Sequence, residues 1–187
     1  MAPDETYQDL DTGACTEGQK EKILTFAADT RKFEIERFWQ RSLFFWGFIT
    51  AAVVAYGAAT KSPQLQSLAA CYGFLCSLAW SLQNRGSKYW HESWEKKVEH
   101  VQCAVLGTNL FSNKEPIKRP GWLEAKRYSS SKLVMALSDI TCVAWLGLIY
   151  FALEIDTASS LDEAKCVTVA VTLGAAYVLV FGTKSKP

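Results

Sequence analysis

The chain has 187 residues, 49% of them hydrophobic, and a formal net charge of +1. Its mean hydropathy of +0.01 averages two unlike populations, because four nearly uncharged runs of roughly twenty residues alternate with segments that hold almost all the charge. A run of that length crosses a hydrocarbon layer of about 30 Å as a helix, so the pattern excludes a water-soluble globular domain. It predicts an all-α, polytopic membrane protein with four transmembrane helices, at residues 42–60, 64–84, 133–153 and 166–183.

Two segments precede the first run. Residues 1–16 are acidic and polar, which predicts a disordered tail, and residues 17–187 would then form a single four-span domain. Residues 17–41 contain only one glycine and no proline. We therefore expect one helix that continues into the first span and extends from it into the cytoplasm.

The second run is followed by a patterned segment. Pro63 suits the first turn of the second span, and a link this short forces an antiparallel hairpin. Residues 84–87 are predicted to form a kink or a membrane exit. A cytoplasmic amphipathic helix is predicted at 88–106, with Gln102 on its polar face and apolar residues at steps of four, four, three and four: Trp90, Trp94, Val98, Val101 and Val105.

That amphipathic helix carries two sets of candidate residues. Its apolar stripe is predicted to pack on neighbouring helices or to lie at the bilayer surface, with a ligand pocket as the alternative. The same helix carries His91, Glu95, Glu99, His100 and Cys103, some of which have the three- and four-residue spacings that could chelate a metal, although His91 and His100, nine apart, match one helical face poorly. A solvated charged face explains them more simply, so we predict neither a metal nor a cofactor.

Asp139 is the only formal charge inside any of the four runs. A charge facing lipid there costs at least about 2.5 kcal/mol, so it must face protein or water, or be protonated. One interpretation is a proton-coupled or ion-coupled site. The favoured one is an interhelical hydrogen bond to a hydroxyl group, with Ser138 and Thr141 as possible helpers.

Small residues recur at four-residue spacing in three of the runs. Such rows let helix backbones approach closely, within a subunit or between subunits. We take Gly47 and Ala51 as packing candidates of the first row. The full rows are Gly47, Ala51 and Ala55; Ala69, Gly73 and Ser77; and Ala170 with Gly174.

The basic residues are strongly one-sided. Of the 20 Lys and Arg residues, 18 lie before the first run, between the second and third, or after the fourth. By the positive-inside rule both termini and the middle link should be cytoplasmic. Aromatic residues at the same level, expected in the headgroup region, are Phe38, Trp39, Trp46, Trp80, Tyr89 and Trp90.

Sequence motifs of catalysis are missing. We find no Walker motif, nucleophile elbow, dinucleotide fingerprint or Cys-x-x-Cys pair, so the chain is predicted not to be an enzyme. Basic residues of the middle link are interleaved with acids, which disfavours nucleic acid and fits attraction to anionic lipid. The favoured function is an oligomeric scaffold that could recruit a cytoplasmic protein. Alternatives are a channel or transporter that uses Asp139, and a membrane sensor.

Two stretches carry a family resemblance. FWQRSLFFWGF at 38–48 and NRGSKYWHESWE at 84–95 resemble the RipA family of octameric membrane proteins, over about residues 33–111. The resemblance implies a homo-oligomer of eight subunits in the bacterial inner membrane. It implies no chemical reaction.

Overall fold

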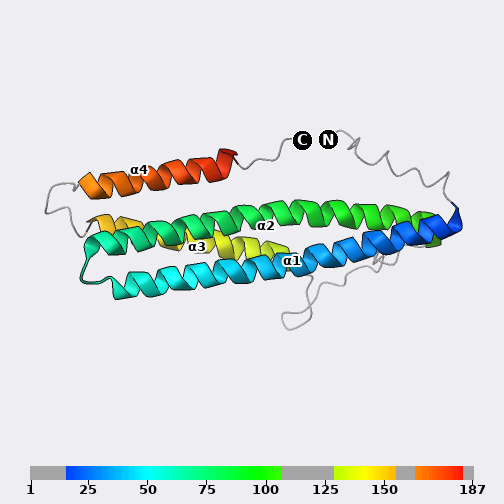
Figure 1. The fold of residues 1–187 in the computed structure, drawn as a ribbon, viewed down its shortest axis with the longest axis horizontal. Coiled ribbons are helices and arrows are strands. Elements are labelled where there is room, and N and C mark those ends of the chain that lie inside the picture. The colour runs from blue at the N-terminus through cyan, green and yellow to red at the C-terminus, as the bar shows by residue number, and fades with distance from the viewer. Residues whose placement is uncertain (1–15, 107–128, 155–162, 183–187) are drawn as a thin grey trace, which may run out of the picture. The chain divides into compact units, whose positions relative to one another are not determined.

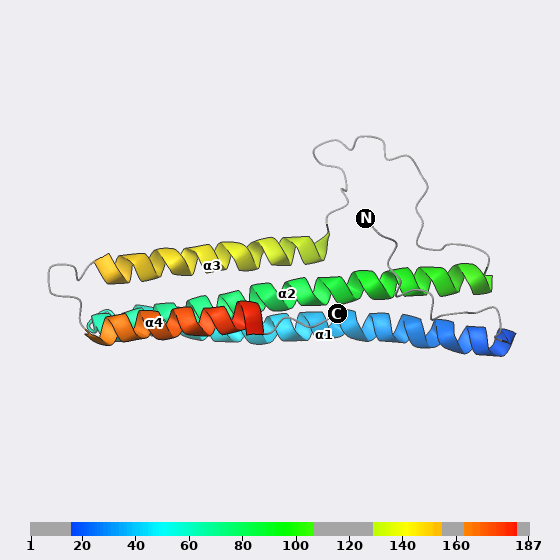
Figure 2. The same cartoon turned by 90° about the horizontal axis from the view of Figure 1, so that it is seen from above.

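A computed structural model describes residues 16–106, 129–154 and 163–182. Within these ranges the chain forms helices and no strand, which confirms the all-α prediction (Figure 1 and Figure 2). The predicted tail, apart from Thr16, lies outside the described residues. The elements are α1 Glu17–Ala58, α2 Pro63–Leu106, α3 Ser130–Glu154, α4 Glu163–Tyr177 and a π-helical segment η3 Val178–Gly182.

Three described helices are long and apolar enough to cross a membrane: α1, α2 and α3. Helices α2 and α3 contain the predicted spans at 64–84 and 133–153, and α1 contains the span predicted at 42–60 except for its last two residues. The predicted fourth span falls on a shorter apolar helix, Cys166–Gly182, formed by α4 and η3.

Helix α1 begins with a capping box and runs for 42 residues. The Gln19 side-chain oxygen accepts hydrogen bonds from the Thr16 backbone N–H at 2.9 Å and from the Thr16 hydroxyl at 3.0 Å. This pairing satisfies a backbone donor that the helix itself leaves open. The helix then continues without a break into the first apolar run, as predicted.

Helix α2 begins at Pro63 as predicted, but it does not break at residues 84–87. Residues 88–106 are helical and end at Leu106 as predicted, but they form the second half of one 44-residue helix and not a separate helix. The kink or membrane exit at 84–87 stays a prediction. A single glycine inside a helix costs only about 1 kcal/mol. Asn84 and Ser87, on either side of Gly86, are both buried, so packing offsets this local preference.

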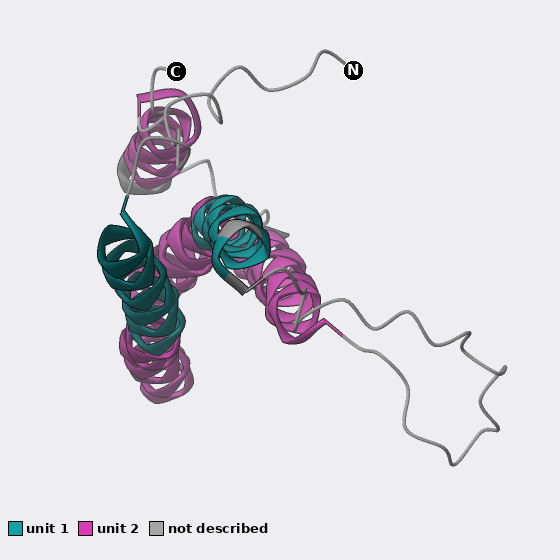
Figure 3. Ribbon diagram, turned by 90° about the vertical axis from the view of Figure 1, so that its right-hand side faces the viewer, with its two compact units in different colours: residues 1–38, 87–127 teal, residues 39–86, 128–187 magenta. Residues whose placement is uncertain are grey.

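The chain divides into two compact units, which Figure 3 colours separately. Unit 1 comprises residues 1–38 and 87–127, and its described part pairs the first half of α1 with the second half of α2. Unit 2 comprises residues 39–86 and 128–187. Its buried cluster takes one residue from each of three helices, Ala52 of α1, Ala70 of α2 and Trp145 of α3.

The closest packing in unit 2 is between Gly73 of α2 and the indole of Trp145. A Cβ atom added to Gly73 would lie 2.4 Å from the Trp145 ring, so the backbone of α2 touches this ring directly. Tyr56 of α1 packs edge-on against the same indole, with ring centroids 6.3 Å apart. The row Ala69, Gly73 and Ser77 thus serves packing inside the subunit. The row Gly47, Ala51 and Ala55 is exposed in the single chain.

Two of the six aromatic residues predicted at headgroup level, Phe38 and Trp80, are buried against other helices. The Trp80 indole N–H points to the Ser42 hydroxyl at 3.4 Å, and Trp46 packs edge-on against the Trp80 ring. A buried indole needs such a partner for its N–H. The sequence does not distinguish a ring that faces a helix from one that faces lipid.

Candidate functional site

The strongest polar cluster of unit 2 joins Asp139 of α3 to Arg85 of α2. The Arg85 guanidinium donates through Nη1 to Oδ1 at 3.1 Å and through Nη2 to Oδ2 at 2.9 Å. The Ser81 hydroxyl donates to the same Oδ1 at 2.6 Å. The carboxylate therefore accepts three charge-assisted hydrogen bonds, two of them from the parallel fork that arginine forms with carboxylates.

Further polar contacts extend this cluster along the α2–α3 interface. Arg85 also donates to the Ser81 carbonyl oxygen at 3.2 Å and lies against the Ser81 hydroxyl. Beside this pair, the Asn84 amide donates to the Ser138 hydroxyl at 3.3 Å, and Ser138 donates to the Met135 carbonyl at 2.8 Å. Ser81, Asn84 and Ser138 are all buried. The Asn84–Ser138 bond is thus a second side-chain link between α2 and α3, at the positions that precede Arg85 and Asp139.

The charged groups themselves are only half-buried. The Arg85 and Asp139 side chains are 47% and 46% exposed in the single chain, so one side of the pair faces outward. A bidentate pair presents no net charge, and its bonds leave neither carboxylate oxygen of Asp139 without a donor. The arrangement is suited to holding two helices in register rather than to attacking a substrate.

The sequence pointed to Asp139 and predicted a hydroxyl partner for it, which is Ser81, but it did not reveal Arg85 as its ion-pair partner. Ser81 is a hydroxyl on a neighbouring helix, as the favoured interpretation required. Ser138 and Thr141 do not bond to the carboxylate, since they donate to the backbone carbonyls of Met135 and Leu137. Arg85 was counted with the cytoplasmic link, although Ser81 and Arg85 are four residues apart and so share one helix face.

The predicted apolar stripe on α2 is buried only in its middle. Val98 and Val101 belong to the core of unit 1, whereas Val105 and Trp94 are partly exposed. The Lys97 ammonium lies 4.8 Å from the centre of the Trp94 ring. Trp90 is 51% exposed and packs edge-on against the neighbouring Tyr89 ring, with ring centroids 5.6 Å apart, so it lies outside the core of unit 1.

Gln102 contradicts its predicted place on the polar face. It is 2% exposed, and among the residues that the structure describes neither polar atom of its side-chain amide has a hydrogen-bond partner. The helical repeat brings position 102 next to the buried positions 98 and 101, which explains the error.

The candidate metal residues point to other partners. His91 packs edge-on against Phe38, with ring centroids 5.5 Å apart, and Glu95 pairs with Arg31 at 3.0 Å. Among the residues that the structure describes, no three His, Cys, Asp or Glu side chains are grouped to hold a metal ion.

A comparison with known proteins gives one match. The model of the octameric membrane protein family (8xMP) matches residues 21–154, a range that contains α2, α3 and the whole Arg85–Asp139 cluster. No curated protein and no solved structure matches the chain significantly. The narrower resemblance to the RipA family stays a prediction.

Proposed function

This chain belongs to the octameric membrane protein family, and from that membership we propose that it is a non-enzymatic, homo-octameric scaffold of the bacterial inner membrane. In this proposal the chain crosses the membrane four times, with both termini and the link between α2 and α3 in the cytoplasm. Unit 1 provides contacts between subunits on the cytoplasmic side.

The observation that carries the proposal is a set of exposed aromatic side chains in unit 1. Phe26 is 67% exposed, Tyr89 67% and Trp90 51%, and Phe33 is half exposed. All four lie outside the apolar runs. In the proposed topology Phe26 and Phe33 lie on the part of α1 that extends into the cytoplasm, and Tyr89 and Trp90 lie at the headgroup level just past the second run. Large apolar side chains exposed to water, as Phe26 and Phe33 are in this topology, mark protein–protein interfaces. Because every subunit repeats them, contacts between subunits would cover them around a closed ring.

The first small-residue row supports contacts within the membrane as well. Gly47 and Ala51 are exposed, and a Cβ atom added to Gly47 would meet no atom within 4 Å. Lipid-facing helices do not need small residues, whereas helices of adjacent subunits use them to approach closely.

The Asp139 geometry favours this scaffold over the channel that the sequence left open. An ion pathway needs groups that exchange partners with the ion, and this carboxylate is already bound by Arg85 and Ser81. Ion flux measured in liposomes separates the two functions. We expect no flux through the wild-type protein or through Asp139→Asn, and flux that the substitution abolishes would instead support the channel.

The mass of the native protein in mild detergent tests the assembly. We expect a complex of eight 20.8-kDa chains, and a smaller complex for Trp90→Ser. His100→Ser is the matched control, since His100 is an exposed polar residue of the same helix. Circular dichroism should show equal helix content in all three proteins. A monomeric wild-type protein would overturn the proposal.

Labelling of single cysteines tests the topology. In a background without other cysteines, Ser62→Cys should react with a membrane-impermeant maleimide in intact cells. Cys103, which is exposed on α2, should react only after the membrane is opened. The reverse pattern would place the termini outside.

A further inference from the structure

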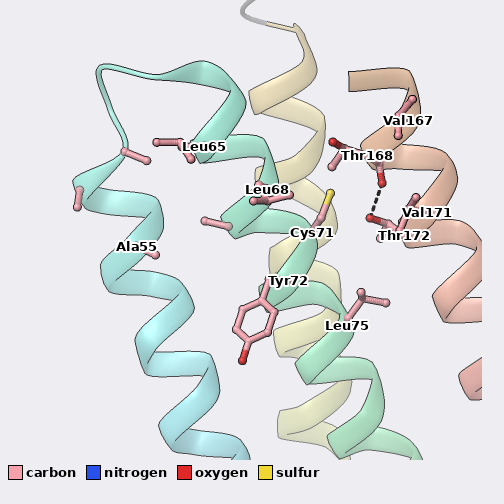
Figure 4. A pocket seen from close by; sticks show the side chains of 13 residues that line it. Ala55, Leu65, Leu68, Cys71, Tyr72, Leu75, Val167, Thr168, Val171 and Thr172 are labelled. Atoms are coloured by element: carbon pink, nitrogen blue, oxygen red, sulfur yellow. Dashed lines mark hydrogen bonds between the residues drawn. The ribbon is translucent and has the colours of Figure 1, made fainter. Parts of the chain in front are cut away.

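Unit 2 contains a large apolar cavity at the end where α1 turns into α2 (Figure 4). Its volume is about 860 Å³, within the range of small-molecule pockets. Three helices line it, α1 with Ala55 and Ala58, α2 from Leu65 to Leu75, and α4 from Val167 to Thr172, together with Ala59 in the turn after α1.

Small side chains create this space. Alanines at positions 55, 58, 59 and 69 stand where larger residues would fill the gap, and leucines such as Leu68 and Leu75 form much of the remaining wall. The Thr172 hydroxyl is one of its polar lining groups. It donates to the Thr168 carbonyl at 2.7 Å, so its hydrogen-bond donor already has a partner within α4. No lining residue is charged. The cavity therefore suits a flexible hydrocarbon chain better than a polar solute.

Among the described side chains, one positive charge stands next to the cavity. Lys61 lies in the turn between α1 and α2, where the Ser62 N–H donates to the Ala59 carbonyl at 2.9 Å, and Ala59 lines the cavity. Lys61 is exposed and is the only basic residue between positions 42 and 84. In the proposed topology this turn lies at the outer membrane surface, where lipid phosphates lie.

We propose that this cavity binds an anionic phospholipid, with one acyl chain between α1, α2 and α4 and the headgroup phosphate beside Lys61. The site rests on the proposed topology, which places the turn at headgroup level. A second copy of the chain is a poorer occupant, because in a closed ring all subunits share one orientation and a neighbour brings its own Lys61 to the same level.

Native mass spectrometry of the full-length protein with added phosphatidylglycerol or phosphatidylcholine tests the acyl-chain site. We expect saturation at one phosphatidylglycerol per subunit. Ala55→Phe should fill the cavity and reduce the retained lipid at least tenfold. Val54→Phe is the matched control, because Val54 is exposed on α1 and does not line the cavity. Equal lipid retention by both variants would overturn the proposal.

The headgroup contact is tested separately. Lys61→Gln should lose a preference of about fivefold for phosphatidylglycerol, as expected for one lysine near an anionic headgroup, and Lys61→Arg should keep it. A wild-type protein without this preference would overturn the headgroup assignment. The same spectra report the number of subunits. If the wild-type assembly is smaller than an octamer but still binds one lipid per chain, only the octamer is refuted. If Ala55→Phe loses subunits while its bound lipid is unchanged, the cavity is occupied by protein and the lipid site is refuted.

Discussion

Removing Arg85 and removing Asp139 should have unequal effects on stability. Helix α2 carries Arg85 roughly 33 Å beyond Pro63 at 1.5 Å per residue, which is just past a hydrocarbon layer of about 30 Å. Its guanidinium can therefore reach water when the partner is lost, as long basic side chains do near helix ends. Asp139 has a short side chain inside the third run and no comparable escape.

The magnitudes follow from that asymmetry. Arg85→Leu leaves an unpaired carboxylate in an apolar setting, and we expect the free energy of unfolding to fall by about 2–3 kcal/mol. Asp139→Leu leaves an arginine that can rehydrate, and we expect a loss of about 1 kcal/mol. The double variant has neither charge, so its loss should also stay near 1 kcal/mol, which gives a coupling energy of about 2–3 kcal/mol.

A double-mutant cycle measures these values. Unfolding in mixed micelles can be followed by tryptophan fluorescence, since Trp80 is buried on the same helix as Arg85. Asn84→Ala is a useful control because it removes the Asn84–Ser138 hydrogen bond between α2 and α3 without changing charge. Equal losses for the two single variants, or a coupling energy below about 0.5 kcal/mol, would refute the assignment of the pair as the main α2–α3 contact.

Three further predictions concern the packing of the helices and one ion pair. Gly73→Ala should destabilise the protein by about 1–2 kcal/mol, because the added methyl group clashes with Trp145. Gly47→Ala should not destabilise the chain, because no described atom lies near that position. Equal thermal midpoints for the two variants would contradict the close approach of Gly73 to Trp145. Val98→Glu should unfold unit 1 and lower helix content by circular dichroism, because Val98 is buried; an unchanged spectrum would contradict that core. The exposed Arg31–Glu95 pair should show a coupling below about 1 kcal/mol, and a larger, salt-insensitive coupling would argue against its exposure.

Much of the helical framework can be predicted from the sequence because lipid imposes simple requirements. Apolar runs of sufficient length located the spans in α1, α2 and α3, and Pro63 marked the start of α2. Local propensity failed at residues 84–87, where buried Asn84 and Ser87 keep the helix continuous through Gly86. A glycine is a weak breaker when its neighbours are packed.

The candidate site was only half predictable for a similar reason. An isolated charge in an apolar run is conspicuous, so Asp139 was found. Its partner Arg85 stands at the edge of a run, where a basic residue also satisfies the positive-inside pattern. Which helix faces which is a tertiary property, and neither hydropathy nor spacing reveals it. For the same reason, the sequence did not show that Trp80 is buried and Trp90 is exposed.

The bidentate bond between Arg85 and Asp139 also bears on how the protein enters the bilayer. During synthesis α2 emerges before α3, so the guanidinium is already at the membrane when the carboxylate arrives. Without Arg85, α3 would carry an unpaired Asp139 carboxylate into lipid. With Arg85 already in place, α3 can pack against α2 as it inserts. We expect insertion of α3 in a translation assay with membrane vesicles to become inefficient when α2 is deleted or carries Arg85→Leu. The earlier helix would then assist the membrane insertion of the later one through this ion pair.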